Sequence, residues 1–245
     1  SGEMLLPTNL FLTVLASFGF GKISKQITSN LNSINIISGL SNPTMMSYAT
    51  EALKEASKKE FILNILKKGD TSIQDLEVIE GEKSANFGEK KKPQLLVSKK
   101  EYMGGLAHGR FSFERYESEG TRKLFELSPY IYEAVKEGRP LVIDEFDARF
   151  HSLLTKRIVQ LFNSEENKQT QFIFVTHDTS LLSSSFLRRD QIEFVEKDEA
   201  GASHLYSLAE INGIRAKASF EKDYRHGKYG AIPLVEDFSE LAANS

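Results

Sequence analysis

The chain lacks cysteine altogether, although it is 245 residues long. This absence excludes disulfide bonds and the thiolate sites that hold zinc or iron–sulfur clusters. It is compatible with a reducing compartment, and we expect a cytoplasmic protein. The chain also lacks a large excess of charge, since its formal net charge is −3. A strongly basic nucleic-acid module is therefore not expected.

A long apolar run is missing as well. The most apolar early stretch, Asn9 to Gly21, is shorter than the roughly 20 residues that a membrane-spanning helix needs. No basic segment precedes it and no small-residue cleavage site follows it, so we expect neither a signal peptide nor a membrane partner. Hydrophobic residues still make up 40% of the chain, which is enough to build a globular core.

Most histidines and the lysine runs carry little information about binding. No histidines are paired at a spacing that holds a metal, and His151, which closely follows Asp147, is interpreted as a cap rather than a ligand. Lys90 to Lys92 and Lys99-Lys100 could contact nucleic-acid phosphates, but a run of charge is usually a solvated face. Nucleic acid is thus a possible but unsupported partner. The histidines interpreted as surface residues are His108, His204 and His226.

The first part of the chain, residues 1–110, predicts a helical and β-ribbon insertion. Residues 8–30 are apolar at roughly helical spacing, and Thr44 to Lys68 has the apolar periodicity of a helix that Gly69-Asp70 ends. The period then changes to that of strands. The expected strands are Ile73 to Ile79, Gln94 to Val97 and Arg110 to Tyr116, with a flexible linker from Gly81 to Lys92.

The second part, residues 111–245, predicts alternating helices and strands, and hence an α/β fold with a mainly parallel sheet. Leu141 to Ile143 is apolar on both faces, as buried parallel strands are. Gly138 is placed to close the helix before it. The other expected elements are helices over about Thr121 to Lys136 and Ser152 to Phe162, a strand over Phe172 to Thr176, and a hairpin of Gln191 to Val195 with His204 to Ser207.

The strongest chemical signal is the acidic pair Asp144-Glu145, at the end of the Leu141–Ile143 strand. Open α/β sheets bind ligands at the carboxyl ends of their strands, and charge is costly there unless a cation or polar ligand is present. In nucleotide hydrolases, the first acid of such a pair helps to hold Mg²⁺ and the second can polarise the attacking water. A solvated pair of acids is the simpler alternative.

Two further segments strengthen this interpretation by their order. The strand from Phe172 ends at His177, which could reach a γ-phosphate beside Glu145, although a lone histidine there is more often a surface or core residue. Upstream, Glu117 to Thr121 leads into a helix. A helix N-terminus offers amide groups and a favourable dipole to an anion. Ser118 could equally be a simple N-cap.

In this order the segments resemble the ABC-type ATPase family, in the branch of the SMC proteins and the RloA-like bacterial anti-phage and abortive-infection ATPases. The resemblance is good over about residues 110–235 and loose before them. It implies a P-loop NTPase fold of which this chain carries the C-terminal half. The matching segments are Glu117 to Thr121 at the signature motif, Leu141 to Glu145 at the Walker B strand, Asp147 in the D-loop, His177 at the switch histidine, Leu187 to Ile192, and Tyr229 to Pro233.

The resemblance also implies a role for each matched residue. Ser118 and Gly120 would contact the γ-phosphate of an ATP held by the opposite subunit, with Thr121 in the same nucleotide-binding segment. Asp144 would support Mg²⁺ and Glu145 would act as the general base. Asp147 would communicate across the dimer, and His177 would sense the γ-phosphate. Glu119 and Thr121 depart from the family's Leu-Ser-Gly-Gly-Gln, which puts the strength of the contact across the dimer in question.

A P-loop of the form Gly-x-x-x-x-Gly-Lys-Ser/Thr does not occur in the sequence. The nearest approach is Gly21-Lys22, but Ile23 follows it and Ala16 stands where the first glycine should be. We interpret Gly19 to Lys22 as a break between helical stretches. A truncated chain, a split protein and a degenerate homologue all stay open. We expect a P-loop-bearing N-terminal half to complete the ATPase, and this chain alone to be inactive.

Three functions therefore stay open on the sequence. The first is the C-terminal part of an ABC-type ATPase that binds and hydrolyses ATP with Mg²⁺ at the interface of a homo-oligomer, regulating a nuclease or toxin effector in phage defence. The second is a Mg²⁺-dependent nuclease in which Asp144, Glu145 and Asp147 hold two cations. Acids from one short segment are unusual for such a site. The third is a non-catalytic interaction module.

Overall fold

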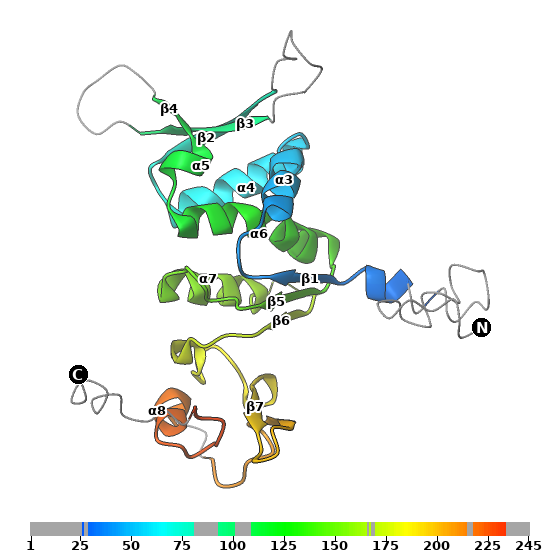
Figure 1. Ribbon diagram of the computed structural model, residues 1–245, viewed down its shortest axis with the longest axis vertical. Helices are drawn as coiled ribbons and strands as arrows, with labels where there is room; N and C mark the ends of the chain where they lie inside the picture. Colours follow the sequence, from blue (N-terminus) through cyan, green and yellow to red (C-terminus); the bar gives the residue numbers. More distant parts are fainter. Residues whose placement is uncertain are drawn as a thin grey trace, which may run out of the picture. The chain divides into compact units, whose positions relative to one another are not determined.

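The structure is a computed structural model that describes residues 26, 29–80, 93–100, 109–165, 167, 170–214 and 218–233. The chain divides into two compact units, residues 1–177 and residues 178–245 (Figure 1). The sequence-based domain boundary at residue 110 is a different division and stays a prediction. Among the described residues, no helix is long and apolar enough to cross a membrane. The predicted helix over residues 8–30, apart from residues 26, 29 and 30, and the linker from Gly81 to Lys92 lie outside the described residues.

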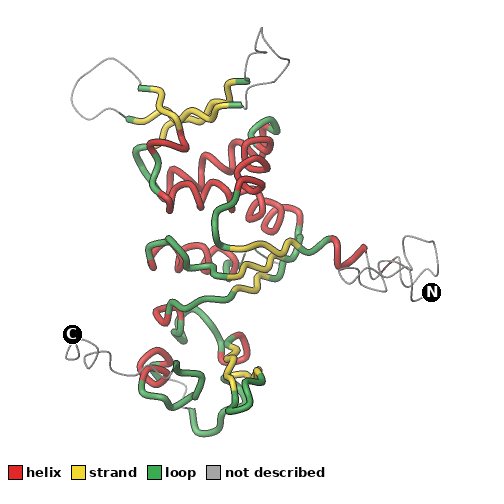
Figure 2. The backbone as a smooth tube through the Cα atoms, in the orientation of Figure 1, coloured by secondary structure: helices red, strands yellow, loops and turns green. Residues whose placement is uncertain are grey.

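A parallel three-stranded sheet is the centre of the first unit. Its strands are β1 (Asn35–Ser38), β5 (Leu141–Asp144) and β6 (Phe172–Phe174), in the order β1-β5-β6. Figure 2 shows the three strands side by side. The predicted α/β fold is confirmed. Strand β1 was not anticipated, and it pairs with β5 over its whole length, from Asn35 opposite Leu141 to Ser38 opposite Asp144.

One face of this sheet is closely packed. Leu141 and Ile143 of β5 are fully buried. Phe172 of β6 stacks on Phe162, with ring centroids 4.2 Å apart. Phe162 is the last residue of α7 (Ser152–Phe162), which has the predicted bounds. Because side chains alternate along a strand, this face takes the odd-numbered residues of β5 and the even-numbered residues of β6.

The opposite face of the sheet exposes apolar side chains. Ile36 lies beside Val142, which lies beside Ile173, so the three side chains form one row across the strands. Ile36 is 73% exposed and Ile173 57% exposed, and Val175 beyond β6 is 52% exposed. We call these four residues the open face. Parallel sheets are almost always covered on both faces, so an open face of this kind is unusual.

Two helices follow β1 where the sequence predicted one. They are α3 (Pro43–Ala52) and α4 (Ala56–Gly69). Asn42 caps α3 by accepting a hydrogen bond from the backbone amide of Met45 at 2.9 Å. Both helices pack against α6 (Glu119–Glu137), as Figure 1 shows. The single-helix prediction was wrong because both helices bury a face on the same neighbour, so the apolar periodicity continues through the turn between them.

An antiparallel sheet joins α4 to the rest of the unit. It consists of β2 (Ile73–Ile79), β3 (Gln94–Lys99) and β4 (Arg110–Ser112), in that order. The predicted strand from Arg110 to Tyr116 is too long, because α5 (Phe113–Tyr116) replaces its second half. Phe113 is fully buried, with its ring 4.9 Å from that of Phe125 in α6. The chain must turn at this point to bury that ring, which a continued strand would not allow.

The second unit is a small domain built around an aromatic core. Its elements are η2 (Thr179–Leu181), η3 (Arg189–Gln191), β7 (Glu193–Lys197), β8 (Ser203–Ser207) and α8 (Phe220–Arg225). The predicted hairpin is confirmed, although its first strand begins after η3 rather than at Gln191. The core consists of Ile192, Phe194, Leu208, Phe220 and Tyr229.

The segment after α8 closes this core. The Tyr229 side chain is buried, and the hydroxyl of Tyr206 donates a hydrogen bond to the Tyr229 carbonyl oxygen at 2.6 Å. The hydroxyl of Tyr224 likewise donates to the Ala231 carbonyl oxygen at 2.8 Å. The distinctive Tyr229 to Pro233 sequence therefore has a structural role, since its backbone satisfies two tyrosine hydroxyls.

Gly230 should be intolerant of a side chain. Its φ is 72°, and a Cβ there would lie 2.7 Å from the Tyr206 hydroxyl. We expect Gly230→Ala to lower the free energy of unfolding of the second unit by about 1–3 kcal/mol, because backbone strain and a clash combine. Gly213→Ala is the matched control, since Gly213 has a φ of 81° but open space around it. Hydrogen exchange of the β7 and β8 amides measures both, and equal effects would contradict the clash.

Candidate functional site

The acidic pair lies at the carboxyl end of β5, at an edge of the parallel sheet. Asp144 is the last residue of β5, and both Asp144 and Glu145 are exposed. The Asp144 Oδ1 atom accepts a hydrogen bond from the Glu145 amide at 3.0 Å. Glu145 has a φ of 52°, which is uncommon for a residue with a side chain. The chain therefore turns sharply where the strand ends.

The end of β6 is bound to the loop that follows β5. The Phe146 amide donates to the Val175 carbonyl oxygen at 2.9 Å. The Asp147 Oδ1 atom accepts from the Thr176 hydroxyl at 2.7 Å and from the His177 amide at 3.1 Å. The structure thus brings Asp147 and His177 together, through the His177 backbone. The His177 side chain is exposed, and the contact made by Thr176 was not anticipated.

Ser118 caps α6, and the predicted helix begins at Glu119. Its hydroxyl oxygen accepts from the Thr121 amide at 3.1 Å and lies 2.9 Å from the Thr121 hydroxyl. The helix closes at Gly138, as predicted, with a left-handed φ of 73°. The N-cap geometry leaves the exposed Ser118 hydroxyl at the helix N-terminus, where the helix dipole favours negative charge.

The first turn of α6 contacts the loop after β5. A Cβ on Gly120 would lie 3.0 Å from the carbonyl oxygen of Arg149, so a larger residue would push the two backbones apart. The Arg149 guanidinium lies 3.4 Å from the Glu119 carboxylate. The structure therefore places the signature-like segment and the loop from Glu145 to Arg149 side by side, although they are distant in sequence.

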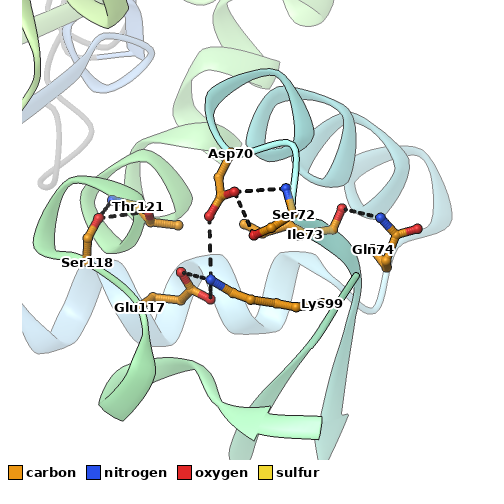
Figure 3. Close-up of polar contacts among 8 residues, drawn as sticks. All are labelled: Asp70, Ser72, Ile73, Gln74, Lys99, Glu117, Ser118 and Thr121. Carbon is orange, nitrogen blue, oxygen red and sulfur yellow. Dashed lines mark hydrogen bonds and ion pairs between the residues drawn. The ribbon is translucent and has the colours of Figure 1, made fainter. Parts of the chain in front are cut away.

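Glu117, just before the N-cap, anchors this segment to the antiparallel sheet. Its carboxylate is almost fully buried, and Lys99 Nζ lies 2.8 Å from Oε1 and donates to Oε2 at 3.0 Å. Lys99 also lies 3.5 Å from Asp70. Figure 3 shows the three charged groups together beside Ser118 and Thr121.

The surroundings shift the pKa values of Lys99 and Asp70. Burial alone would lower the pKa of Lys99, but the hydrogen bond to Glu117 holds it above its usual value. Burial also opposes ionisation of Asp70, yet hydrogen bonds from Ser72 and the charge of Lys99 hold its pKa below the usual range. Lys99 is thus paired with two carboxylates of the protein itself, which makes the nucleic-acid contact considered from the sequence less favourable for it.

Lys123 is a functional candidate that the sequence analysis missed. Its side chain is fully buried, and its Nζ donates to carbonyl oxygens of the loop after β5. A signal was present, because Lys123 occupies the same helical face as Leu127 and Ile131, at four-residue steps along an otherwise apolar row. A lysine in such a row needs hydrogen-bond partners when buried.

The described residues contain no group of three histidine, cysteine or acidic side chains close enough to hold a metal ion by themselves. Asp147 uses one carboxylate oxygen for Thr176 and His177. The exposed carboxylate of Asp144, whose Oδ1 accepts from the Glu145 amide, can act as a single ligand at the sheet edge. Mg²⁺ is commonly held by one or two carboxylates together with phosphates and water, so Asp144 fits a Mg²⁺ that arrives with a nucleotide.

The structure tests the sequence interpretation of His151 but does not describe several other residues considered from the sequence. His151 is the N-cap of α7, where its Nδ1 accepts from the Leu153 amide at 3.2 Å, so its interpretation as a cap is confirmed. The Gly21-Lys22 pair, Lys90 to Lys92 and His108 lie outside the described residues.

Comparison with protein families finds one match, which covers most of this site. Residues 62–183 match the family described as "AAA domain, putative AbiEii toxin, Type IV TA system". The matched range includes the α6 N-terminus, the end of β5 and the end of β6. No curated protein sequence matches the chain.

Comparison with solved structures finds similarity to structures from work on SMC ATPases. One, from work on ATP-driven dimerization and DNA-stimulated activation of SMC ATPases, is 17% identical with a TM-score of 0.45; the alignment covers 76% of this chain and 99% of that one. A second, an SMC head bound to the C-winged helix domain of ScpA, is 20% identical with a TM-score of 0.38. That alignment covers 61% of this chain and 42% of the other, so this chain spans under half of it. Over residues 62–183 the family match agrees with the resemblance to abortive-infection ATPases noted from the sequence, because the matching family is described as an AAA domain and a putative AbiEii toxin.

Proposed function

We propose that this chain supplies the signature segment and the hydrolytic acid of an ATPase that closes on ATP as a dimer. Ser118, Gly120 and Thr121 face the γ-phosphate of an ATP held by the opposite subunit. Asp144 supports Mg²⁺, Glu145 activates the attacking water, and His177 senses the γ-phosphate. Asp147 links the two subunits. The P-loop is supplied by a separate half, either of the same gene product or of a second chain.

One observation carries this proposal: the first turn of α6 lies against the loop that carries Glu145 and Asp147. The contact runs from Gly120 to the Arg149 backbone and from Glu119 to the Arg149 side chain. A helix N-terminus attracts phosphate through its amide groups and dipole. A phosphate that approaches that N-terminus from a second subunit would therefore meet a segment held against the loop that carries the hydrolytic acid.

The open face supports the need for a second half. Ile36, Ile173 and Val175 are more than half exposed on a parallel sheet, and such sheets are normally covered on both faces. Strand β6 pairs on one side only among the described residues, with β5. We propose that the P-loop half covers this face, because the γ-phosphate that it grips must reach the carboxyl ends of β5 and β6.

The cofactors follow from the same arrangement. ATP with Mg²⁺ suits a site whose own residues offer one exposed carboxylate ligand and a helix N-terminus rather than a complete metal cage. Water activation by Glu145 requires a solvent-accessible carboxylate, and Glu145 is exposed. The solved relative studied for ATP-driven dimerization and the family described as a putative AbiEii toxin suggest the wider role. We propose a homodimer that controls a nuclease or toxin effector in phage defence, in the cytoplasm.

The test of this proposal is sedimentation velocity of the complete ATPase, this chain together with its P-loop half. With ATP and Mg²⁺ the sedimentation coefficient should rise as dimers form, and Ser118→Arg should abolish that rise because its bulk and length block the phosphate approach. Ser118→Asp should abolish it too, through repulsion of the phosphate, while keeping an N-cap acceptor. Ser118→Ala loses the same cap as Ser118→Arg, worth about 1 kcal/mol, without blocking the approach, so it should weaken the rise rather than abolish it.

Three results would count against the proposal. An ATP-dependent rise that survives in Ser118→Arg and Ser118→Asp would show that the α6 N-terminus does not meet nucleotide. Cleavage of nucleic acid by the purified chain with Mg²⁺ or Mn²⁺ and no nucleotide, lost in Asp144→Asn, would favour the nuclease alternative. A complete protein that contains no P-loop and binds no ATP would favour the interaction module.

A further inference from the structure

Lys123 is buried where an apolar residue would be expected. It is 1% exposed, in the second turn of α6. Bringing an ammonium group out of water is costly, and replacing a buried charge by an apolar residue of similar size is often neutral or stabilising. Burial is also the main reason that the pKa of Lys123 is lowered to about 8. Stability alone would favour a leucine or methionine, so the lysine calls for another explanation.

The hydrogen bonds of Lys123 all go to one loop. Its Nζ donates to the carbonyl oxygens of Ala148 at 2.6 Å, Phe146 at 2.9 Å and Glu145 at 3.4 Å. These three acceptors use the three N–H donors of an ammonium group. The ring of Phe150 lies 4.3 Å from Nζ, within the range of a cation–π contact. A carboxylate partner would hold the lysine to one side chain. These carbonyls belong to the main chain, so Lys123 holds the backbone of the loop in one conformation.

That backbone is strained at both ends. Glu145 has a φ of 52° and Arg149 a φ of 64°, and neither is a glycine. Such conformations persist only where the surroundings hold them. Two further contacts fix the loop from other sides: the Gly39 amide of the chain beyond β1 donates to the Asp144 carbonyl at 2.5 Å, and Thr176 holds the Asp147 side chain. Lys123 ties the loop to α6 through its backbone, beside the contacts that Arg149 makes with Glu119 and Gly120.

We propose that Lys123 is a positioning residue that locks the backbone of the Glu145–Arg149 loop to the helix beginning after Ser118, so that the two move as one body. The hydrogen bonds from Lys123 to the loop support this positioning role by themselves. Its consequence, that contact of the α6 N-terminus with a phosphate is passed directly to Glu145, rests on the proposed function.

The test measures the loop without nucleotide, so that it can fail independently of the proposed function. In Lys123→Met, which keeps the chain length but removes the donors, amide exchange at Phe146, Ala148 and Phe150 should quicken by at least about tenfold. These amides are hydrogen bonded in the intact loop. Amides in the middle of α6 and in β2 and β3 should keep their protection, because the global core is unchanged. Hydrogen exchange read by NMR or mass spectrometry resolves both sets.

Two control variants separate the lock from general repacking. Leu127→Met changes a fully buried residue one turn along the same face of α6, and Lys136→Met removes an exposed lysine near the end of the same helix. Neither should affect the loop amides. Unchanged loop exchange in Lys123→Met, or a loss of protection spread evenly over the first unit, would overturn the proposal.

A pH titration of the wild-type protein gives a second reading that does not depend on any variant folding. The charged groups facing the ammonium are Asp147, Glu145 and Glu126, which raise its pKa, and Arg149, which lowers it. Opening of the loop that frees the ammonium returns its pKa from about 8 toward 10.5, so the open form binds the proton more tightly. Raising the pH between these values therefore disfavours opening.

Loop protection, corrected for the intrinsic exchange rate, should then increase with pH by up to about tenfold per unit in this window. It should stay flat in Lys123→Met.

Discussion

Glu145→Gln is expected to lower the rate of ATP hydrolysis by the complete ATPase by about 10²- to 10⁴-fold, the usual contribution of a general base. The amide cannot accept a proton from water, yet it has nearly the same size as the carboxylate. Because Glu145 is exposed at the sheet edge and its side chain is not part of the core, folding should be unaffected. The ATP-bound dimer should consequently persist, and its lifetime by sedimentation should lengthen as turnover falls.

Glu137→Gln is the matched control, because Glu137 is an exposed glutamate at the end of α6, away from the loop. It should leave turnover unchanged. If Glu145→Gln hydrolyses ATP at the wild-type rate, Glu145 is not the base. If it neither hydrolyses ATP nor forms the dimer, its role lies in nucleotide binding rather than in water activation. The measurement is steady-state phosphate release together with sedimentation at the same ATP concentration.

Phe146→Ala should have the largest effect on stability, a loss of about 3–5 kcal/mol in the free energy of unfolding of the first unit. Phe146 is fully buried immediately after the acidic pair. Its ring centroid lies 5.3 Å from that of Phe172 and 5.2 Å from that of Phe174. Both rings of β6 therefore lose contacts when the Phe146 side chain is removed. The cavity would lie directly beneath the candidate site. Urea unfolding monitored by circular dichroism would measure the loss.

Ile173→Ala is the control from the other face of the same sheet. Ile173 is 57% exposed, and exposed substitutions usually change stability by less than about 0.5 kcal/mol. A small effect in the isolated chain that becomes larger when the P-loop half is added would support covering of the open face. A large effect in the isolated chain would instead show that the open face is already buried in solution.

Local sequence signals predicted the elements that carry the site. The apolar run at Leu141, the capping serine before α6 and the left-handed glycine after it each act within a few residues, so the sequence suffices to place them. The hairpin of the second unit was recognisable for the same reason. The alternation of helices and strands was enough for the α/β class.

Tertiary contacts decided what the local patterns could not. Strand β1 is short and is stabilised mainly by pairing with β5, so nothing in its own four residues marks it strongly. The break between α3 and α4 follows from shared packing on α6, and α5 exists because Phe113 must be buried against Phe125. In each case a distant partner outweighs the local preference of the chain.

The candidate site also has features that the sequence predicted and features that only the fold created. The sequence by itself determined which residue types are present and in what order: a capping serine and glycine, an acidic pair at a strand end, and a histidine after the next strand. Only the tertiary structure brought Gly120 against Arg149, joined Asp147 to the His177 backbone, and placed Lys123 under the loop between them. The physical reason is that a motif is a property of neighbouring residues along the chain, whereas a buried ammonium gains its role from carbonyl oxygens more than twenty residues away, which only the folded chain brings within hydrogen-bonding distance.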